Sequence, residues 1–340
     1  MNRDTERLIG EAPAFLKVLE DVSRIAPLDK PVLIVGERGT GKELIAARLH
    51  YLSNRWDADF LKMNCAAISD TLLETELFGH DAGAFTGASK THHGRFERAN
   101  GGTLFLDELA TTSMLVQEKI LRVIEYGEFE RVGGSKTLSV DVRLIAATNE
   151  DLPHLAAQGD FRLDLLDRLA FDVITLPPMR ERPEDIMLLA HHFAMTMAGD
   201  LGLEFFAGFS PDAEKTLLDY SWPGNIRELK NAVERSVYRN LDPDSPVHEI
   251  ILDPFDSPFR PGSFQATSQA PAQTPQSNPP NTFPLDMKQV VQSFEIELLN
   301  QAMEKARFNQ RQAAELLGLT YHQLRGYLKK YELLKSSDAD

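Results

Sequence analysis

A glycine-rich turn near the beginning of the chain has the composition of a phosphate-binding site. It lies between an apolar run at residues 31–35 and a helical pattern at residues 44–49. Glycines let successive backbone N–H groups converge on phosphate oxygens, and the N-terminus of the next helix adds a favourable dipole. We call this turn the phosphate loop; its residues are Gly36, Glu37, Arg38, Gly39, Thr40, Gly41, Lys42 and Glu43.

The phosphate loop predicts a site for a nucleoside triphosphate, with Lys42 reaching the terminal phosphates. In most such loops a Ser or Thr follows the lysine and its hydroxyl binds Mg²⁺, but Glu43 stands at that position here. The loop therefore assigns no direct hydroxyl ligand, and Thr40 or water is the alternative. A tight turn without a ligand is the competing interpretation.

Two carboxylates follow a second apolar run, at residues 104–106. Ligands of open α/β sheets bind beyond the carboxyl ends of the strands, where Asp107 and Glu108 would lie. There Asp107 could hold Mg²⁺ and Glu108 could polarise the attacking water, which are the two further requirements of nucleotide hydrolysis. The alternative is a solvated strand end.

Polar residues also follow two other apolar runs, at residues 60–63 and 143–147. Thr148 and Asn149 could sense the terminal phosphate from the same edge of the sheet. Asn64 could donate a hydrogen bond to Glu108 and hold that carboxylate idle.

Arg162 and Arg168 are candidates for neutralising phosphate charge. On one straight helix, side chains six residues apart point about 120° apart, so the two arginines could not both reach one phosphate. Either a bend intervenes, or one arginine acts and the other supports an interface. The competing interpretation is a surface ion pair with Asp164 or Asp167.

The elements that must position these residues indicate an α/β fold. Short apolar runs at residues 31–35, 104–106 and 143–147 alternate with helical patterns such as residues 111–126, which predicts a mostly parallel sheet with helices on both faces. We expect this α/β part to span residues 1–175. After about Leu176 the strand signals stop, and a helical subdomain is expected over residues 176–255.

Charge and composition divide the rest of the chain. Residues 256–284 include seven prolines and only two charged residues, which predicts a disordered linker. The whole chain has 36 basic and 51 acidic residues, but residues 305–335 have seven basic and two acidic ones. The net charge of −15, which taken alone argues against DNA as a partner, therefore conceals a small basic module at residues 285–340.

The composition also bounds the cellular setting. The single Cys65 excludes an intramolecular disulfide framework and a cysteine-based zinc site. The sequence has neither a leader nor a run approaching 18 apolar residues. We therefore expect a cytoplasmic protein that is not inserted in a membrane.

The basic module is predicted to be a helix-turn-helix DNA-binding domain. Two helical patterns meet at Gly318, and Thr320 with Gln323 has the spacing of a capping box. The second helix would enter the major groove. Its candidate DNA-binding residues are Thr320, Tyr321, His322, Arg325, Lys329 and Lys330. The alternative is a small helix pair that mediates another interaction.

Together with the phosphate loop and residues 104–108, two further motifs carry a family resemblance. They are residues 76–88 and residues 222–229. The set resembles the sigma-54-dependent activators, or bacterial enhancer-binding proteins, of the AAA+ ATPases. The resemblance implies an AAA+ P-loop NTPase core with a helical lid, a C-terminal Fis-type helix-turn-helix module, and ATP and Mg²⁺ as ligands.

Further roles follow from this resemblance. It implies a homo-oligomeric ring, usually a hexamer, with ATP between subunits. Arg162 and Arg168 match the family's trans-acting arginine fingers, and Asn64 matches its switch partner for Glu108. Thr148 and Asn149 match the first sensor, and Arg227 matches the second, on the lid. Independently, Arg227 lies beside an apolar helix face rather than on it, although a plain surface arginine has the same pattern.

A short loop within residues 76–88 matches the family's signature for contact with sigma-54. We call it the contact loop; its residues are Gly83, Ala84, Phe85, Thr86, Gly87 and Ala88. Two glycines around one aromatic make a flexible tip that presents a single apolar anchor, Phe85. A buried turn phenylalanine is the alternative.

The expected function is ATP-driven transcription activation. The protein would bind enhancer DNA and convert the closed complex of sigma-54 RNA polymerase holoenzyme to the open complex. The resemblance extends to members that act on the phage shock operon, with phage shock protein A as the inhibitor, and Trp56 is a candidate docking residue for it. The alternatives are a DNA-binding repressor that keeps the ATPase fold, and a helicase or replication loader.

Overall fold

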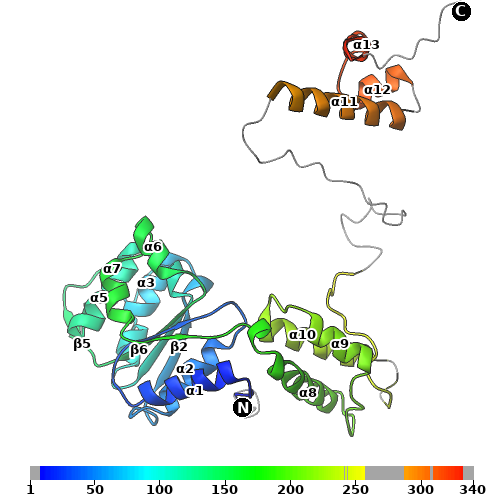
Figure 1. Ribbon diagram of the computed structural model, residues 1–340. Helices are drawn as coiled ribbons and strands as arrows, with labels where there is room; N and C mark the ends of the chain where they lie inside the picture. Colours follow the sequence, from blue (N-terminus) through cyan, green and yellow to red (C-terminus); the bar gives the residue numbers. More distant parts are fainter. Residues whose placement is uncertain (1–7, 241, 243, 257–286, 307–308, 332–340) are drawn as a thin grey trace, which may run out of the picture. The chain divides into compact units, whose positions relative to one another are not determined.

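The chain divides into two compact units, Met1–Pro258 and Phe259–Asp340. The computed structural model describes residues 8–240, 242, 244–256, 287–306 and 309–331. Apart from Asp256, the predicted linker at residues 256–284 lies outside the described residues. Figure 1 shows the α/β part and the helical part of the first unit, and the three helices of the second.

The first unit is built on a sheet of five parallel strands in the described part of the chain. Their order across the sheet is β2-β3-β6-β1-β7. The strands are β1 (Val32–Val35), β2 (Phe60–Asn64), β3 (Thr103–Asp107), β6 (Arg143–Thr148) and β7 (Val173–Thr175). This confirms the predicted α/β class and its mostly parallel sheet.

The side chains of the strands alternate between two hydrophobic cores, one on each face of the sheet. Leu33, Leu104 and Leu144 pack on one face with Leu73 of α3 (Asp70–Phe78) and Val116 of α5 (Met114–Tyr126). The neighbours of those strand residues point to the other face, because successive side chains of a strand alternate. Val32, Ile34, Phe105 and Ile145 accordingly pack with Val22 of α1 (Pro13–Ile25) and Ile45 of α2 (Lys42–Tyr51).

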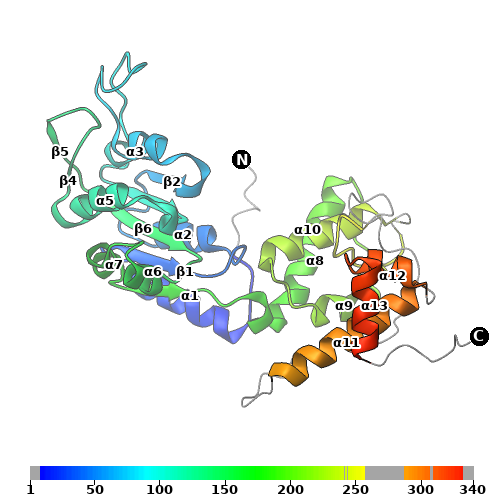
Figure 2. The same cartoon turned by 90° about the horizontal axis from the view of Figure 1, so that it is seen from above.

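Helices cover both faces of the sheet, as Figure 1 and the view from above in Figure 2 show. A separate antiparallel pair, β4 (Glu128–Glu130) and β5 (Thr137–Ser139), follows α5. The helices of this part are α1 (Pro13–Ile25), α2 (Lys42–Tyr51), α3 (Asp70–Phe78), α4 (Arg95–Arg98), α5 (Met114–Tyr126), α6 (Leu152–Gln158) and α7 (Leu163–Leu169).

Two helix boundaries differ from the expectation. The helix predicted at residues 111–126 begins at Met114, because the Ser113 side chain caps it and Leu109–Thr111 forms a separate 3₁₀ turn. The assumption that Arg162 and Arg168 share one helix was wrong. Arg162 is the N-cap of α7, in extended conformation, and only Arg168 lies on the helix.

The helical part of the first unit has its own core. Its helices are α8 (Pro183–Asp200), α9 (Pro211–Asp219) and α10 (Asn225–Tyr238), and we call this part the lid. Leu229, Val233 and Val237 form the buried face of α10, and Ile226 packs against it partly buried. Trp222 is completely buried beside them and donates its indole N–H to the Leu217 carbonyl at 2.8 Å.

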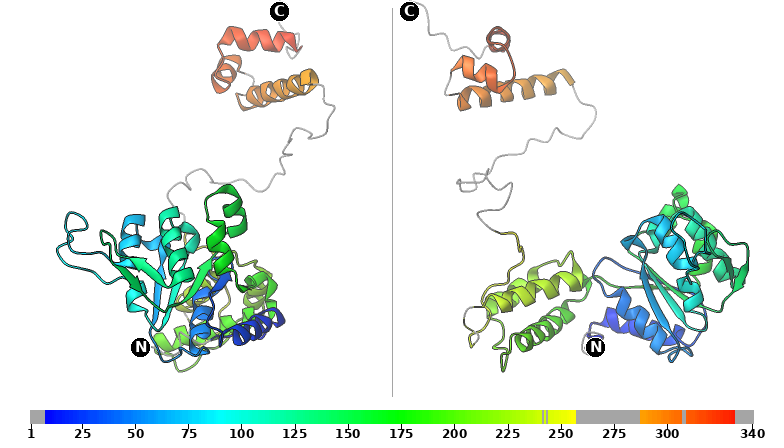
Figure 3. Two further views of the ribbon diagram at one scale, coloured as in Figure 1. Left: turned by 90° about the vertical axis from the view of Figure 1, so that its left-hand side faces the viewer. Right: turned by 180° about the vertical axis from the view of Figure 1, so that it is seen from behind.

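The second unit consists of α11 (Met287–Lys305), α12 (Gln310–Leu316) and α13 (Tyr321–Lys330). Figure 3 shows these three helices in two further views. Thr320 and Gln323 form the predicted capping box at the start of α13, and Leu324 and Leu328 are buried against α11 and α12. The sequence patterns did not predict α11. None of the described helices has the length and apolarity needed to cross a membrane.

Neighbouring leucines of α3 test the assignment of its buried face. Leu73 is fully buried and Leu72 is 57% exposed. We expect Leu73→Ala to lower the free energy of unfolding by about 2–5 kcal/mol because it leaves a cavity. Leu72→Ala, the matched control, should change it by less than about 1 kcal/mol. Urea unfolding measures both, and equal losses would contradict the assignment.

Candidate functional site

The phosphate loop connects β1 to α2 and is shaped by glycines with positive φ. Gly41 is the N-cap of α2 with φ +97°, and Gly39 has φ +79°. A Cβ on Gly39 would lie 2.3 Å from the carbonyl oxygen of Gly224 in the lid. Glycine is therefore required at Gly39 both by the backbone conformation and by the close approach of the lid.

Lys42 lies inside the phosphate loop. Its ammonium donates to the carbonyls of Gly36 and Glu37 at 2.8 and 3.2 Å. Burial lowers the pKa of Lys42, and the nearby carboxylates of Asp107 and Glu108 partly oppose this shift. The ammonium is thus placed where it can exchange loop carbonyls for phosphate oxygens.

The two carboxylates lie at the carboxyl end of β3. Asp107 Oδ1 accepts a hydrogen bond from the Glu108 backbone N–H at 3.0 Å. Glu108 has φ +55°, a left-handed conformation that is unfavourable for a non-glycine residue. Its carboxylate lies 3.9 Å from the Arg38 guanidinium. Backbone geometry and charge together aim Glu108 toward the phosphate loop.

Asn64 pairs in register with Asp107 at the ends of β2 and β3. Its Oδ1 accepts the backbone N–H of Ala66 at 2.9 Å. Among the described residues, no hydrogen bond joins Asn64 to Glu108. The sheet therefore brings the two side chains to the same edge without the contact that the sequence suggested.

The polar end of β6 lies beside the beginning of the phosphate loop. The Thr148 carbonyl accepts the Gly36 backbone N–H at 3.2 Å. The Thr148 hydroxyl is buried and accepts the Glu150 backbone N–H at 3.0 Å. Asn149 donates to Glu150 at 3.2 Å, while its own Oδ1 is buried without a partner among the described residues. Asn149 thus keeps a free acceptor near the loop.

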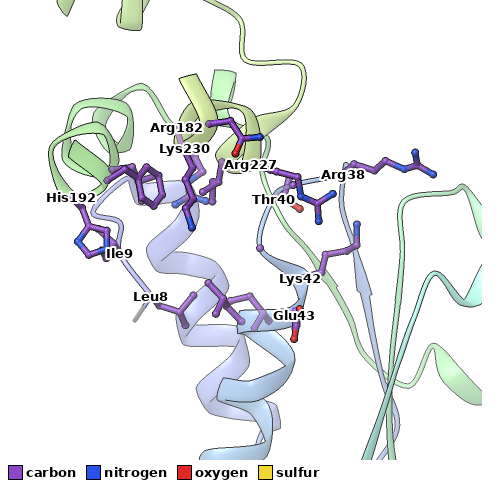
Figure 4. Close-up of a pocket in the computed structure, with 18 of the residues that line it drawn as sticks. Leu8, Ile9, Arg38, Thr40, Lys42, Glu43, Arg182, His192, Arg227 and Lys230 are labelled. Carbon is purple, nitrogen blue, oxygen red and sulfur yellow. The ribbon is translucent and has the colours of Figure 1, made fainter. Parts of the chain in front are cut away.

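A cavity of about 590 Å³ lies between the phosphate loop, the carboxylates at the end of β3 and the lid; Asn64, Thr148 and Asn149 are not among the residues that line it. Figure 4 shows Lys42 of α2 and Arg227 of α10 on its walls, with Leu8 and Ile9 on the N-terminal side. Asp107, Glu108, and Glu43, which pairs with Lys62 at 3.1 Å, also line it. The cavity therefore combines loop N–H donors, cations and carboxylates with apolar walls, as a nucleotide requires.

Two lid residues without an assigned role from the sequence connect the lid to the phosphate loop. The fully buried Asn225 donates to the Glu37 carboxylate at 3.1 Å and to the Arg38 carbonyl at 3.0 Å, and it accepts the Met179 N–H at 2.8 Å. Arg180 forms an ion pair with Glu37 at 2.6 Å, and both partners lower the pKa of Glu37. Asn225 lies in the motif at residues 222–229, but only tertiary contacts assign it a function.

Arg162 and Arg168 do not line this cavity. Arg162 pairs with Asp164 at 2.7 Å, as the competing interpretation proposed, and lies 3.6 Å from Glu118 of α5. Arg168 pairs instead with Glu125 at 2.6 Å. Both arginines lie at the surface shared by α5 and α7, so neither lines the cavity of its own chain.

The contact loop lies in the segment between α3 and α4, which projects from the α/β part in Figures 2 and 3. Backbone hydrogen bonds from Gly83 to Ala88 (2.8 Å) and from Ala88 to Phe85 (3.0 Å) close it. Phe85 is 47% exposed, and its ring centroid lies 4.9 Å from that of His80. The aromatic side chain is therefore accessible and is not a buried turn residue.

A charged network supports the base of this segment. Arg131, which follows β4, donates to Glu97 of α4 at 2.6 Å and to Asp81 at 3.1 Å. The hydrogen bond from Arg131, followed by one from His93, lowers the pKa of Glu97 to about 2. Arg131 thus ties this segment to α4 through Asp81 and Glu97.

Trp56 lies between α2 and β2 and is 63% exposed. Tyr51 and Leu52, at the end of α2, are 55% and 44% exposed. Three large apolar side chains thus occupy one short, accessible stretch, and the sequence analysis singled out only one of them.

The candidate DNA-binding residues have different environments on α13. His322, Arg325 and Lys329 are exposed, whereas the Thr320 hydroxyl serves the capping box. Tyr321 is half-buried, with its ring 5.7 Å from that of His322. Lys330 lies 3.4 Å from the Glu295 carboxylate of α11 and donates to the Tyr331 hydroxyl at 2.5 Å. Lys330 is thus engaged within the unit.

Comparison with known proteins identifies the class. The Sigma-54 interaction domain matches residues 8–175, the AAA+ ATPase lid domain matches residues 180–251, and the Fis family of bacterial regulatory proteins matches residues 291–331. The chain belongs to the sigma-54-dependent transcriptional activators and has an AAA+ ATPase as its catalytic part.

Individual relatives extend this result. The chain is 60% identical over 328 residues to the Psp operon transcriptional activator of Escherichia coli K12, covering 96% of this chain and 98% of that protein. It is 52% identical over 235 residues to the Nif-specific regulatory protein of Azospirillum brasilense, covering 69% and 37% of the two chains. The crystal structure of NtrX from Brucella abortus with ADP matches 97% of this chain and 71% of that one, with 33% identity and a TM-score of 0.68.

The exposed and the engaged cations of α13 should differ in DNA binding. We expect Arg325→Ala to weaken DNA binding at least about tenfold and to reduce the salt slope by about 1, because a free cation is lost. Lys330→Ala, the matched control, should weaken it less than about threefold, because Glu295 already holds the ammonium. Fluorescence anisotropy with enhancer DNA at several salt concentrations measures both, and a larger effect of Lys330→Ala would contradict this ranking.

Proposed function

We propose that this protein binds enhancer DNA, hydrolyses ATP and uses its contact loop to convert the closed complex of sigma-54 RNA polymerase to the open complex. The observation that carries the proposal is Phe85, a half-exposed aromatic on a projecting loop with two glycines. The sigma-54 interaction domain that includes this loop also includes the phosphate loop. Hydrolysis and partner contact are therefore assigned to one domain.

ATP is proposed to occupy the cavity between the phosphate loop and the lid. The loop N–H groups and Lys42 would hold the phosphates, and Glu108 would orient and polarise the attacking water. Arg227, Thr148 and Asn149 would contact the terminal phosphates from the lid and from β6. Support comes from Lys42, Glu108 and Arg227, which line the same cavity, and from the NtrX structures crystallised with ADP and with ATP.

The residues at the cavity fit Mg²⁺ bound mainly through phosphate. The described residues contain no cluster of three or more histidine, cysteine or acidic side chains able to hold a metal by itself. Mg²⁺ commonly uses one or two carboxylates together with substrate phosphates and water, and Asp107 supplies such a carboxylate. When bound, the ion would neutralise phosphate charge.

The roles proposed for Asn64 as the switch residue and for the two arginine fingers require contacts that a single resting subunit does not make. Asn64 lies at the same sheet edge as Glu108 and would bond it when the strand ends shift. Arg162 and Arg168 lie outside their own cavity, so a role in hydrolysis requires a neighbouring copy. We propose a hexameric ring in which these arginines complete the site of the adjacent subunit, exchanging Asp164 and Glu125 for phosphate.

A mixture of two defective proteins tests this arrangement. Glu108→Ala and Arg162→Ala should each reduce ATP turnover at least about a hundredfold. Mixed rings should recover turnover at about a quarter of their interfaces, where intact Glu108 of one subunit faces intact Arg162 of the next.

The control for the mixing experiment is Arg24→Ala, which removes an exposed cation of α1 and should leave turnover unchanged. Phosphate release measures turnover at a constant total protein concentration. A mixture as inactive as its components would show that Arg162 does not act across subunits.

The coupling of hydrolysis to promoter opening is tested at the contact loop. Phe85→Ala should retain ATP turnover within about twofold, because Phe85 lies outside the cavity, and should lose promoter opening at least about tenfold because the apolar anchor is gone. Permanganate footprinting with purified sigma-54 holoenzyme, ATP and promoter DNA measures opening. The matched control is Phe205→Ala, a lid aromatic that is 57% exposed. Normal opening by the Phe85 variant would contradict the coupling role.

The target and the regulator are inferred from the relatives. Identity of 60% to the Psp operon transcriptional activator supports the phage shock operon as the target. We propose phage shock protein A as the inhibitor, docking on exposed Trp56 with Tyr51 and Leu52. The proposed partners place the protein in the cytoplasm. The comparisons do not support the alternative of a DNA-binding repressor, and the contact loop argues against it.

A further inference from the structure

A buried ion pair at the start of the lid contacts the segment that precedes α1. Arg182 and Asp185 are both completely buried, and the Arg182 guanidinium donates to Asp185 Oδ2 at 2.7 Å. The other carboxylate oxygen, Asp185 Oδ1, accepts the backbone N–H groups of Glu11 and Ala12 at 2.6 and 2.9 Å. One lid carboxylate thus joins a lid arginine to two amides of the N-terminal segment.

The N-terminal segment is shaped to receive this pair. A Cβ on Gly10 would lie 2.8 Å from Arg182 Nη2 and 2.8 Å from Asp185 Oδ2. The Phe15 ring covers the Arg182 guanidinium, whose central carbon Cζ lies 3.9 Å from the ring centroid. Gly10 therefore permits a close approach that any other residue would obstruct.

The ion pair lies at the edge of the proposed nucleotide cavity, and Arg182 and the Phe15 ring that covers it are among the lining residues. Leu8 and Ile9, directly before Gly10, line the cavity, and so do His192 and Phe193 farther along α8. The helix that holds the N-terminal segment at one end therefore lines the cavity along its middle. The position of the wall formed by Leu8 and Ile9 depends on the lid and not on the phosphate loop alone.

Burying this ion pair costs free energy, and its hydrogen-bond donors do not all have partners among the described residues. Burial lowers the pKa of Arg182, opposed by Asp185, and Arg182 Nη1 has no hydrogen-bond partner among the described residues. Well-packed apolar residues often stabilise a fold as well as a buried ion pair does. Core stability therefore does not explain the pair, whereas the two backbone N–H bonds made by Asp185 give it a positioning role.

We propose that Gly10, Arg182 and Asp185 form a latch that fixes the cavity wall of Leu8 and Ile9 to the lid and thereby sets nucleotide affinity. The inference rests on the proposed nucleotide site. The latch residues have no assigned contact with Asp107, Glu108 or the attacking water. They are positioning residues, and their loss should weaken binding without slowing the chemical step.

Two variants open the latch in different ways. Gly10→Ala keeps every charge but places a methyl group between the backbone of the N-terminal segment and the pair of Arg182 and Asp185. The double variant Arg182→Met/Asp185→Leu removes both charges, so that neither is left buried alone. For both we expect the dissociation constant of a fluorescent ADP analogue and the KM for ATP to rise about tenfold, with kcat within about twofold.

Matched controls separate the latch from a general effect on the lid. Gly199→Ala introduces the same methyl group on α8, where nothing lies within 4 Å, and Glu184→Gln alters the exposed acid next to Asp185. Both should bind nucleotide like the parent. Hydrogen exchange should rise at the Glu11 and Ala12 amides in the latch variants alone, since these amides lose their carboxylate partner.

The outcomes distinguish the latch from the site on which it rests. Parent-like affinity in both latch variants, or a fall of kcat as large as the rise of KM, would overturn the latch. Lys42→Ala reports on the site: loss of ADP binding in this variant places the nucleotide at the phosphate loop. Parent-like binding by Lys42→Ala would overturn the proposed site, and the latch with it.

Discussion

The parallel arrangement of the sheet is the constraint on which the candidate site depends. Strands that run in one direction end at one edge, so residues far apart in the chain become neighbours there. The register between β2 and β3 places Asn64 beside Asp107, and that between β1 and β6 places Val35 beside Thr148. Hydrogen bonding along the strands therefore assembles the phosphate loop, the carboxylates and the sensor candidates at one edge of the sheet.

The lid completes this edge through a small number of polar contacts. Asn225 bonds the phosphate loop, and Asp185 bonds the segment before α1. Both are buried side chains that bond backbone groups, and such hydrogen bonds are directional and costly to leave unmade. In the proposed function, motion of a lid held by such contacts would displace the cavity walls that are bonded to it.

The contact loop and the two arginines Arg162 and Arg168 lie at the surface of the same domain. Phe85 is accessible at the end of a segment that is anchored by Arg131 and Glu97. Arg162 and Arg168 are held by acidic neighbours at a surface away from their own cavity. Both features leave chemistry incomplete within one chain, and in the proposed function a neighbouring subunit and the polymerase complete it.

Local sequence was sufficient for the features that depend on local physical chemistry. Apolar runs predicted β1, β3 and β6 but not β7, glycines around Lys42 predicted the phosphate loop, and the spacing of Thr320 and Gln323 predicted a capping box that the structure confirms. Each of these is decided within a few residues, by backbone conformation or by side-chain periodicity. The α/β class and the helical lid followed from the order of such patterns.

Tertiary structure alone decided the features that depend on contacts between distant segments. Arg162 proved to precede α7 and not to share it with Arg168, because its backbone is extended and its N–H donates to the Gln117 side chain of α5 at 2.9 Å. The roles of Asn225, Gly10 and Asp185 are invisible in the sequence, since their partners lie up to 188 positions away. Sequence therefore determined which chemistry the chain carries, and packing determined which residues hold it in place, because a hydrogen bond across the fold leaves no periodic trace in the chain.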